Sequence, residues 1–181
     1  MVSKNIIPNR REGEEIIYHL RRHWFIFLKI FLGYLGLFLI PPLIYLFFQQ
    51  FMPALLGGEF TSPILLVLAF SYYLMMLVFV FTVWTERYLD VWTLTTDRII
   101  SREQIGLFNR VVSELEMYRV QDVTVEQKGF MSTILNFGDI YIQSAGEIER
   151  FEFKQIGNPY QVAKTIQKLN EASQKTHNIT V

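Results

Sequence analysis

The chain has 181 residues, of which 51% are hydrophobic, and its 17 basic and 17 acidic side chains give a formal net charge of zero. From residue 86 onward there are eleven basic and thirteen acidic residues, so the clustered basic face that duplex binding needs is missing and we expect no nucleic-acid partner. Cysteine is absent, which excludes disulfide bonds and thiol catalysis.

Two long apolar stretches occupy the N-terminal half. Residues 24–48 contain one charged side chain, Lys29, and residues 63–84 contain none. As a helix the first stretch would be about 37 Å long, which exceeds the ~30 Å hydrocarbon core of a bilayer. The loop at residues 49–62 contains proline and glycine, which stop helices. These features predict a transmembrane hairpin over residues 24–85. The alternative is a buried core hairpin of a soluble protein.

Basic residues flank the two stretches unevenly. Residues 49–62 hold no basic residue. Six basic residues precede or begin the first stretch, and one follows the second: Lys4, Arg10, Arg11, Arg21, Arg22 and Lys29, and then Arg87. By the positive-inside rule, both termini are cytoplasmic and the loop is outside. We therefore expect a multi-pass protein of the cytoplasmic (inner) membrane.

Five residues are predicted at the inner membrane interface. Trp24 and Trp84 would place their indole rings in the mixed polar and apolar layer. Lys29 lies close enough to the end of the first span for its side chain to reach the headgroups. Arg21 and Arg22 would lie near anionic lipid headgroups.

The segment before the first span, residues 1–23, is interpreted as a cytoplasmic juxtamembrane segment. Residues 12–23 show an apolar stripe that predicts a short amphipathic helix on the inner surface. On such a helix Glu15, His19 and His23 would share one face, which could hold a metal ion or respond to pH. The simpler interpretation is that they are interfacial polar residues, and no metal is expected.

Small and cyclic residues interrupt the spans. Gly33 and Gly36 would allow close helix approach, and Pro41-Pro42 should kink or break the first span. Tyr72 and Tyr73 lie near the middle of the second span. They could line a transport pathway, but packing between the two helices is favoured, because two helices cannot enclose a pathway and the spans contain no acid, arginine or histidine.

From residue 86 the pattern changes to short alternating segments separated by turns, including turns at Gly106 and at residues 145–147. A helix that begins at Asn158 and Pro159 and runs to about Ala172 follows, and residues 173–181 form a polar tail. The chain is thus predicted to be an α+β membrane protein with a curled antiparallel sheet, capped by one helix, over residues 86–172. The expected strands are residues 88–94, 98–103, 111–120, 122–127, 139–143 and 148–153.

The order of these features resembles the bacterial membrane-anchored pleckstrin-homology-like (PH-like) family with two N-terminal transmembrane helices. The resemblance covers nearly the whole chain and rests on Gly13–Tyr18, Arg21–Trp24, Leu94–Ile100, Gly106, Met117–Val123, Gly138–Ile140 and Ala145-Gly146. It implies a bent sheet of seven strands with a C-terminal helix, and binding without a reaction. Eukaryotic relatives often bind phosphoinositides through a basic first loop, but here residues 95–98 carry one base and one acid.

The sequence does not favour an enzyme. Histidine occurs only at positions 19, 23 and 177, and no phosphate-binding glycine loop is present. We expect no catalytic residue and no cofactor. The first binding hypothesis is a scaffold module that recruits a membrane or cytoplasmic protein, for example by taking an extended peptide as an added strand beside the C-terminal helix. The sequence does not distinguish this scaffold module from a small accessory subunit of a larger membrane complex or from a homo-oligomer.

The second binding hypothesis is a sensor of anionic lipid on the inner leaflet. Arg98, Arg119 and Lys128 would form a basic rim, and Phe130 and Met131 an apolar wedge. The favoured alternatives are that Arg98 and Arg119 pair with neighbouring aspartates, and that the loop containing Phe130 folds onto the core.

Overall fold

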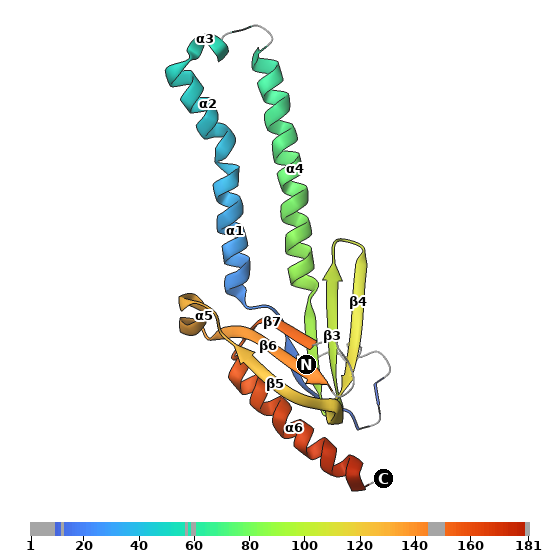
Figure 1. Cartoon of the computed structure of the whole chain (residues 1–181). Coiled ribbons are helices and arrows are strands. Elements are labelled where there is room, and N and C mark those ends of the chain that lie inside the picture. The colour runs from blue at the N-terminus through green and yellow to red at the C-terminus, as the bar shows by residue number, and fades with distance from the viewer. Residues whose placement is uncertain (1–9, 12, 57, 59–60, 145–150, 180–181) are drawn as a thin grey trace. The chain divides into compact units, whose positions relative to one another are not determined.

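The computed structural model describes residues 10–11, 13–56, 58, 61–144 and 151–179, which fall into two compact units (Figure 1). The helical unit comprises residues 24–87. The sheet unit comprises the described residues up to His23 together with those from Tyr88 onward.

The helical unit contains α1 (Trp24–Phe38), α2 (Ile40–Phe51), a short α3 (Pro53–Leu56) and α4 (Thr61–Leu89). Two helical stretches are long and apolar enough to cross a membrane: Trp24–Phe51, with a mean hydropathy of 2.1, and Thr61–Leu89, with 2.6. Their apolar side chains are largely exposed, which does not fit a buried core hairpin. The break between α1 and α2 falls at Leu39, just before the two prolines, as the sequence predicted.

Two tyrosine hydroxyls replace the hydrogen bonds that the prolines remove. Pro41 and Pro42 have no N–H to donate to the carbonyls of Leu37 and Phe38, four residues earlier. Tyr72 Oη donates to Leu37 O at 2.8 Å, and Tyr73 Oη donates to Phe38 O at 3.1 Å. This arrangement confirms the packing interpretation of the tyrosine pair.

Close helix approach at the glycines is not found. A Cβ atom built on Gly33 or Gly36 would meet no atom within 4 Å. The expectation that these two positions bring the spans together is therefore wrong. The hydroxyls of Tyr72 and Tyr73 supply contacts between α4 and α1 instead.

The sheet unit consists of two antiparallel sheets (Figure 1). The first sheet has the order β1 (Ile16–Leu20), β2 (Val91–Thr95), β3 (Arg98–Ile105), β4 (Asn109–Glu116), and the second has β5 (Val120–Glu126), β6 (Phe137–Ser144), β7 (Phe151–Gly157). The 3₁₀ turn η1 (Met117–Arg119) joins the sheets, α5 (Phe130–Ile134) lies between β5 and β6, and α6 (Pro159–Ile179) follows β7. The expected α+β architecture is thus observed.

Both sheets and one face of α6 enclose a single apolar core. Figure 1 shows α6 running along the second sheet, where Val162, Ala163 and Ile166 are buried. The remaining fully buried members of this core come from the strands and η1: Trp92, Leu94, Ile99, Leu115, Met117, Val120, Ile140, Ile142, Phe153 and Ile156. The core fixes how the two sheets face each other, and thereby the groove described below.

The helix predicted over residues 12–23 is wrong, because Ile16–Leu20 forms strand β1 and pairs with β2. Ile16, Ile17 and Tyr18 are residue types that favour strands, and pairing with β2 supplies ladder hydrogen bonds that an isolated surface helix would not gain. A soluble domain that starts at residue 86 therefore leaves out one strand. Helix α6 also continues beyond Ala172, and the turn expected at residues 145–147 lies outside the described residues.

Candidate functional site

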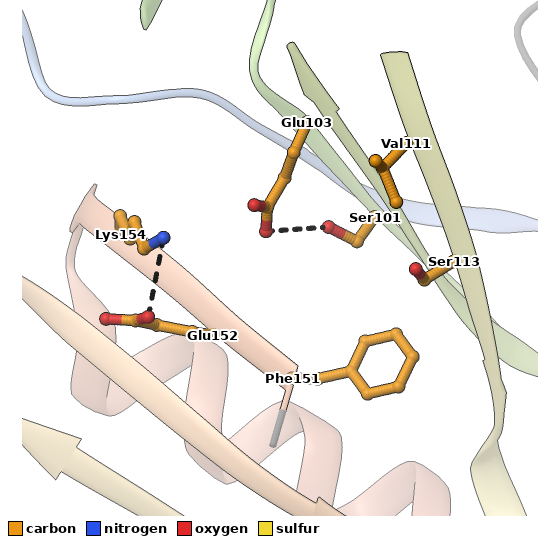
Figure 2. A pocket seen from close by; sticks show the side chains of 7 residues that line it. All are labelled: Ser101, Glu103, Val111, Ser113, Phe151, Glu152 and Lys154. Carbon is orange, nitrogen blue, oxygen red and sulfur yellow. Dashed lines mark hydrogen bonds and ion pairs between the residues drawn. The ribbon is translucent and has the colours of Figure 1, made fainter. Parts of the chain in front are cut away.

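A groove of about 230 Å³ opens between the β3–β4 hairpin and β7 (Figure 2). On one side, Ser101 lies opposite Ser113 and Glu103 lies opposite Val111 across the hairpin. Because side chains alternate along a strand, these four lie on the same face as the core pair Ile99 and Leu115. The core side of the first sheet thus changes from apolar to polar where the groove begins.

The opposite wall of the groove comes from β7. Phe151, Glu152 and Lys154 line it, and the Phe151 ring points across the groove toward Ser113 (Figure 2). The polar contacts are long, with 3.5 Å between Lys154 Nζ and Glu152 Oε2 and 3.4 Å between Ser101 Oγ and Glu103 Oε1. Contacts of this length are weak, so a ligand can replace them at little cost.

The backbone of β7 also contributes to the groove. On one side β7 pairs with β6. On its other side, the backbone hydrogen bonding given by the described residues involves only its C-terminal part, through the bridge between Arg22 and Ile156 and the hydrogen bond from His23 N to Gln155 O at 2.7 Å. Within the described chain, residues 151–154 therefore present a strand edge without a paired strand. Such an edge is a template for a further strand.

Arg22 and Asp90 hold together the places where the chain leaves the sheet unit. Arg22 Nη2 lies 2.7 Å from Asp90 Oδ2, and both side chains are largely buried. Asp90 Oδ1 also accepts the N–H of Gln104 in β3 at 2.9 Å, and Arg22 Nη1 donates to Gln155 Oε1 in β7. We call these contacts the junction clamp, because His23 beside Arg22 directly precedes α1 and Asp90 directly follows α4.

Arg98, predicted as part of a basic rim, is instead buried. Its side chain is only 5% exposed, and its guanidinium pairs with Glu14 at 3.0 Å and Glu114 at 2.7 Å. Burial alone would raise the pKa of Glu14, but hydrogen bonds from Arg98, the Arg11 backbone and Thr95 outweigh it and hold that pKa below its usual value. These contacts leave Arg98 in the fold and not on a lipid-facing rim.

The other predicted lipid-binding residues separate into two places. Arg119 lies in η1 before β5, and Lys128 follows β5, so a strand of about 20 Å separates them. Lys128 is exposed and pairs with Glu126 at 2.7 Å, while Phe130 and Met131 in α5 expose 75% and 47% of their surface. The loop is thus not folded onto the core, and only Lys128, Phe130 and Met131 lie together.

Comparison with protein families identifies the chain. A family model described as "Bacterial PH domain" matches residues 27–170. The chain belongs to this bacterial PH domain family. Among solved structures it is similar to a DUF1696 family protein with a pleckstrin-homology domain from Shewanella loihica PV-4, at 14% identity and a TM-score of 0.37, over 45% of this chain and 70% of that one. No curated protein matches the sequence.

The five residues that were predicted at the inner membrane interface of this PH-family chain differ in their exposure. Trp24 and Trp84 are exposed on the helical unit, and Lys29 Nζ lies 5.2 Å from the centre of the Phe25 ring. Arg21 is exposed, with its guanidinium 5.2 Å from the centre of the Tyr88 ring. Arg22, by contrast, is committed to the junction clamp, which argues against contact with headgroups.

The strand at residues 16–20 also separates the predicted Glu15, His19 and His23 face. His19 Nδ1 lies 3.5 Å from Thr93 Oγ1, and the His23 ring stacks on Phe137 at 5.0 Å. Burial lowers the pKa of both histidines. Among the described residues, no group of three or more histidine or carboxylate side chains is arranged to hold a metal ion.

Sequence reasoning missed the groove. Polar residues that alternate along strands, as in β3 and β4, are typical of a solvated face. The available signal was that Ser101 and Ser113 fall in phase with the apolar residues Ile99 and Leu115, and therefore point inward. The turn expected at Gly106 is found, but sequence reasoning missed the two exposed apolar side chains that it carries, Leu107 and Phe108.

Proposed function

We propose that this protein is a non-enzymatic, membrane-anchored binding module that recruits a protein partner at the inner face of the membrane. Membership of the bacterial PH domain family supports a binding or scaffold role. The two long apolar helices support an anchor, and the basic residues around them support cytoplasmic termini with the loop outside. A topology reporter fused after Val181 should be active only in the cytoplasm, and activity outside would overturn this orientation.

The groove is the proposed capture site for an extended segment of the partner. The observation that carries this proposal is the edge of β7 at residues 151–154, which no strand among the described residues pairs with and which faces the polar walls of the hairpin. A peptide strand placed there would bond to the β7 backbone, and its side chains would alternate between the groove and solvent. Since Glu103 and Glu152 outnumber Lys154, the groove favours a segment with basic or hydroxyl side chains.

This site differs from the one expected beside the C-terminal helix. The sheet edge next to α6 is β5, and Asn170 Nδ2 of α6 already donates to Val120 O there at 2.9 Å. The proposed capture therefore moves from the β5 edge to the β7 edge.

Site-specific photocrosslinking in native membranes tests the capture site. A photoreactive amino acid at Ser113 should crosslink to one partner, and Val111→Arg, which narrows the groove, should abolish that crosslink. The matched control is the same probe at Lys164, which is exposed on α6. Identical products from both positions, or crosslinks that survive Val111→Arg, would contradict capture in the groove.

Sensing of anionic lipid is a second candidate, favoured by the exposed Phe130 and Met131 beside Lys128. An environment-sensitive dye on Met131→Cys in the full chain would report contact, since the chain has no other cysteine. Lipid sensing predicts a blue shift in anionic vesicles that weakens with salt and is absent in neutral vesicles. Equal spectra in both lipids would remove this candidate and leave protein capture unaffected.

A further inference from the structure

The turn of the β3–β4 hairpin exposes large apolar side chains. Gly106, at φ +65°, starts the turn, and Leu107 and Phe108 complete it before β4 begins at Asn109. Phe108 is 93% exposed, and Ile105 and Leu107 are also exposed. Turns usually carry glycine, proline, asparagine, aspartate or serine, so an apolar cluster at this tip indicates a contact that is made outside the sheet unit.

The strand register places this tip at the end of the sheet unit where the chain continues into the long helices. Val91, the first residue of β2, pairs with Arg102, and β3 runs on through Ile105. Three further residues extend the hairpin by about 10 Å past the start of β2. The hydrogen bond from Gln104 N to Asp90 Oδ1 holds this extension beside the residues that follow α4.

A second exposed apolar cluster belongs to the same end. In α5, Phe130, Met131 and Ile134 are exposed. Phe137, three residues after α5, stacks on His23, which immediately precedes the first long helix. The hairpin tip is therefore close to the chain's second exit from the sheet unit, and α5 is close to its first.

The connections to the long helices indicate which surface the hairpin tip and α5 meet. The helices that begin at Trp24 and end at Leu89 are apolar enough to cross a bilayer, so the exits of the sheet unit lie near a membrane surface if they do so. Arg110, exposed next to the tip, suits anionic headgroups.

We propose that the β3–β4 tip inserts Leu107 and Phe108 into the headgroup layer of the membrane that anchors the chain, with α5 as a second point of contact. The occupant of this surface is the bilayer itself. The contact would set the orientation of the sheet unit. It uses the turn residues Leu107 and Phe108, whereas the proposed capture groove is lined by residues 101–103 and 111–113 of the same hairpin, so the two proposals are tested at different positions.

The test uses the full chain with single cysteines, since the natural sequence has none. Phe108→Cys and Gln174→Cys, the latter exposed on the C-terminal part of α6, are each labelled with an environment-sensitive dye. Each is reconstituted as one copy per lipid nanodisc, with and without lipids that carry a quencher near the headgroup. Insertion predicts a blue-shifted dye at position 108 that the lipid quencher extinguishes, and a water-like, unquenched dye at position 174.

Two outcomes would overturn the proposal. A dye at position 108 that is water-like and no more quenched than the one at position 174 would show that the tip stays in solution. A blue-shifted dye at position 108 that the lipid quencher does not reach would show that protein covers the tip. Since a variant at the tip could disturb the hairpin, Leu107→Cys serves as a second labelled position and must give the same result as Phe108→Cys.

Discussion

The helical unit and the sheet unit each contain polar groups that need a partner from elsewhere in the chain. The helical unit supplies neutral hydroxyl groups, and the sheet unit supplies a charged side chain. In the helical unit, the neutral hydroxyls of Tyr72 and Tyr73 reach two carbonyls left by the prolines. In the sheet unit, the charged pair of Arg98 and Glu14 is buried. Loss of a neutral hydrogen bond costs little, whereas a buried charge without its partner costs several times more. The comparison predicts an ordered set of losses in stability.

The largest effect is expected for Arg98→Met. This change leaves the Glu14 carboxylate buried without its cation and should cost about 3–5 kcal/mol of the free energy of unfolding. Hydrogen exchange of the β2 and β3 amides in the full chain measures it. The double variant Glu14→Gln with Arg98→Met should lose less than Arg98→Met alone, because no charge is then left buried. If Arg98→Met lowers the free energy of unfolding no more than a surface variant does, the buried charge pair does not stabilise the sheet unit as proposed.

Acid should weaken the sheet unit in two stages. The pKa of Glu14 is lowered in the folded state, so its contribution is present above the unfolded pKa of 4.5 and is lost as pH falls below that value toward the folded pKa. Burial also lowers the pKa of His23, so protonation favours unfolding from about pH 6.5 downward. Hydrogen exchange as a function of pH should show both stages. In Glu14→Gln the lower stage should shrink and the upper one remain.

A smaller effect is expected for the double variant Tyr72→Phe with Tyr73→Phe. It leaves two helix carbonyls without their donors, and hydrogen bonds between membrane helices average about 0.6 kcal/mol each. Unfolding of the purified chain in a detergent titration, followed by helical circular dichroism, measures the loss. Tyr45→Phe, with its half-exposed ring in the same unit, is the control. A loss as large as that of Arg98→Met would reverse the ranking.

The smallest effect is expected for Lys154→Met in the groove. Lys154 and Glu152 are 3.5 Å apart and partly exposed, and such pairs contribute about 0–1 kcal/mol. Thermal unfolding should be nearly unchanged, while crosslinking of the partner from Ser113 should strengthen, because Glu103 and Glu152 then face a basic segment without a competing cation. A large loss of stability would mean that Lys154 belongs to the fold and not to a binding surface.

The helical unit and the sheet unit also differ in how much of their structure could be predicted from the sequence. The helical unit was predictable because length, hydropathy and the two prolines act locally, within one helix. Most of the sheet was predictable from alternation. Strand β1 was not, because its pairing partner β2 lies more than seventy residues later, and Ile16, Ile17 and Leu20 fit a helical stripe equally well.

Arg98 shows the limit for individual side chains. Its neighbours in the sequence suggested a surface pair with Asp97, whereas Glu14, 84 residues away, is brought to it only by the pairing of β1 with β2. The groove was hidden for a similar reason, since Ser101 and Glu103 face β7 only after the two sheets have packed. Long-range contacts therefore decide which polar residues belong to the fold and which to a site.

The junction clamp has a consequence for how the sheet unit keeps its first strand. Strand β1 precedes the helical unit in the chain and the other strands follow it, so the first sheet forms only when the two ends of a long insertion come together. The ion pair between Arg22 and Asp90 joins residues that are 68 positions apart, one on each side of that insertion. The clamp therefore closes the insertion at its base and keeps β1 attached to a sheet whose other strands lie on the far side of the helices in the sequence.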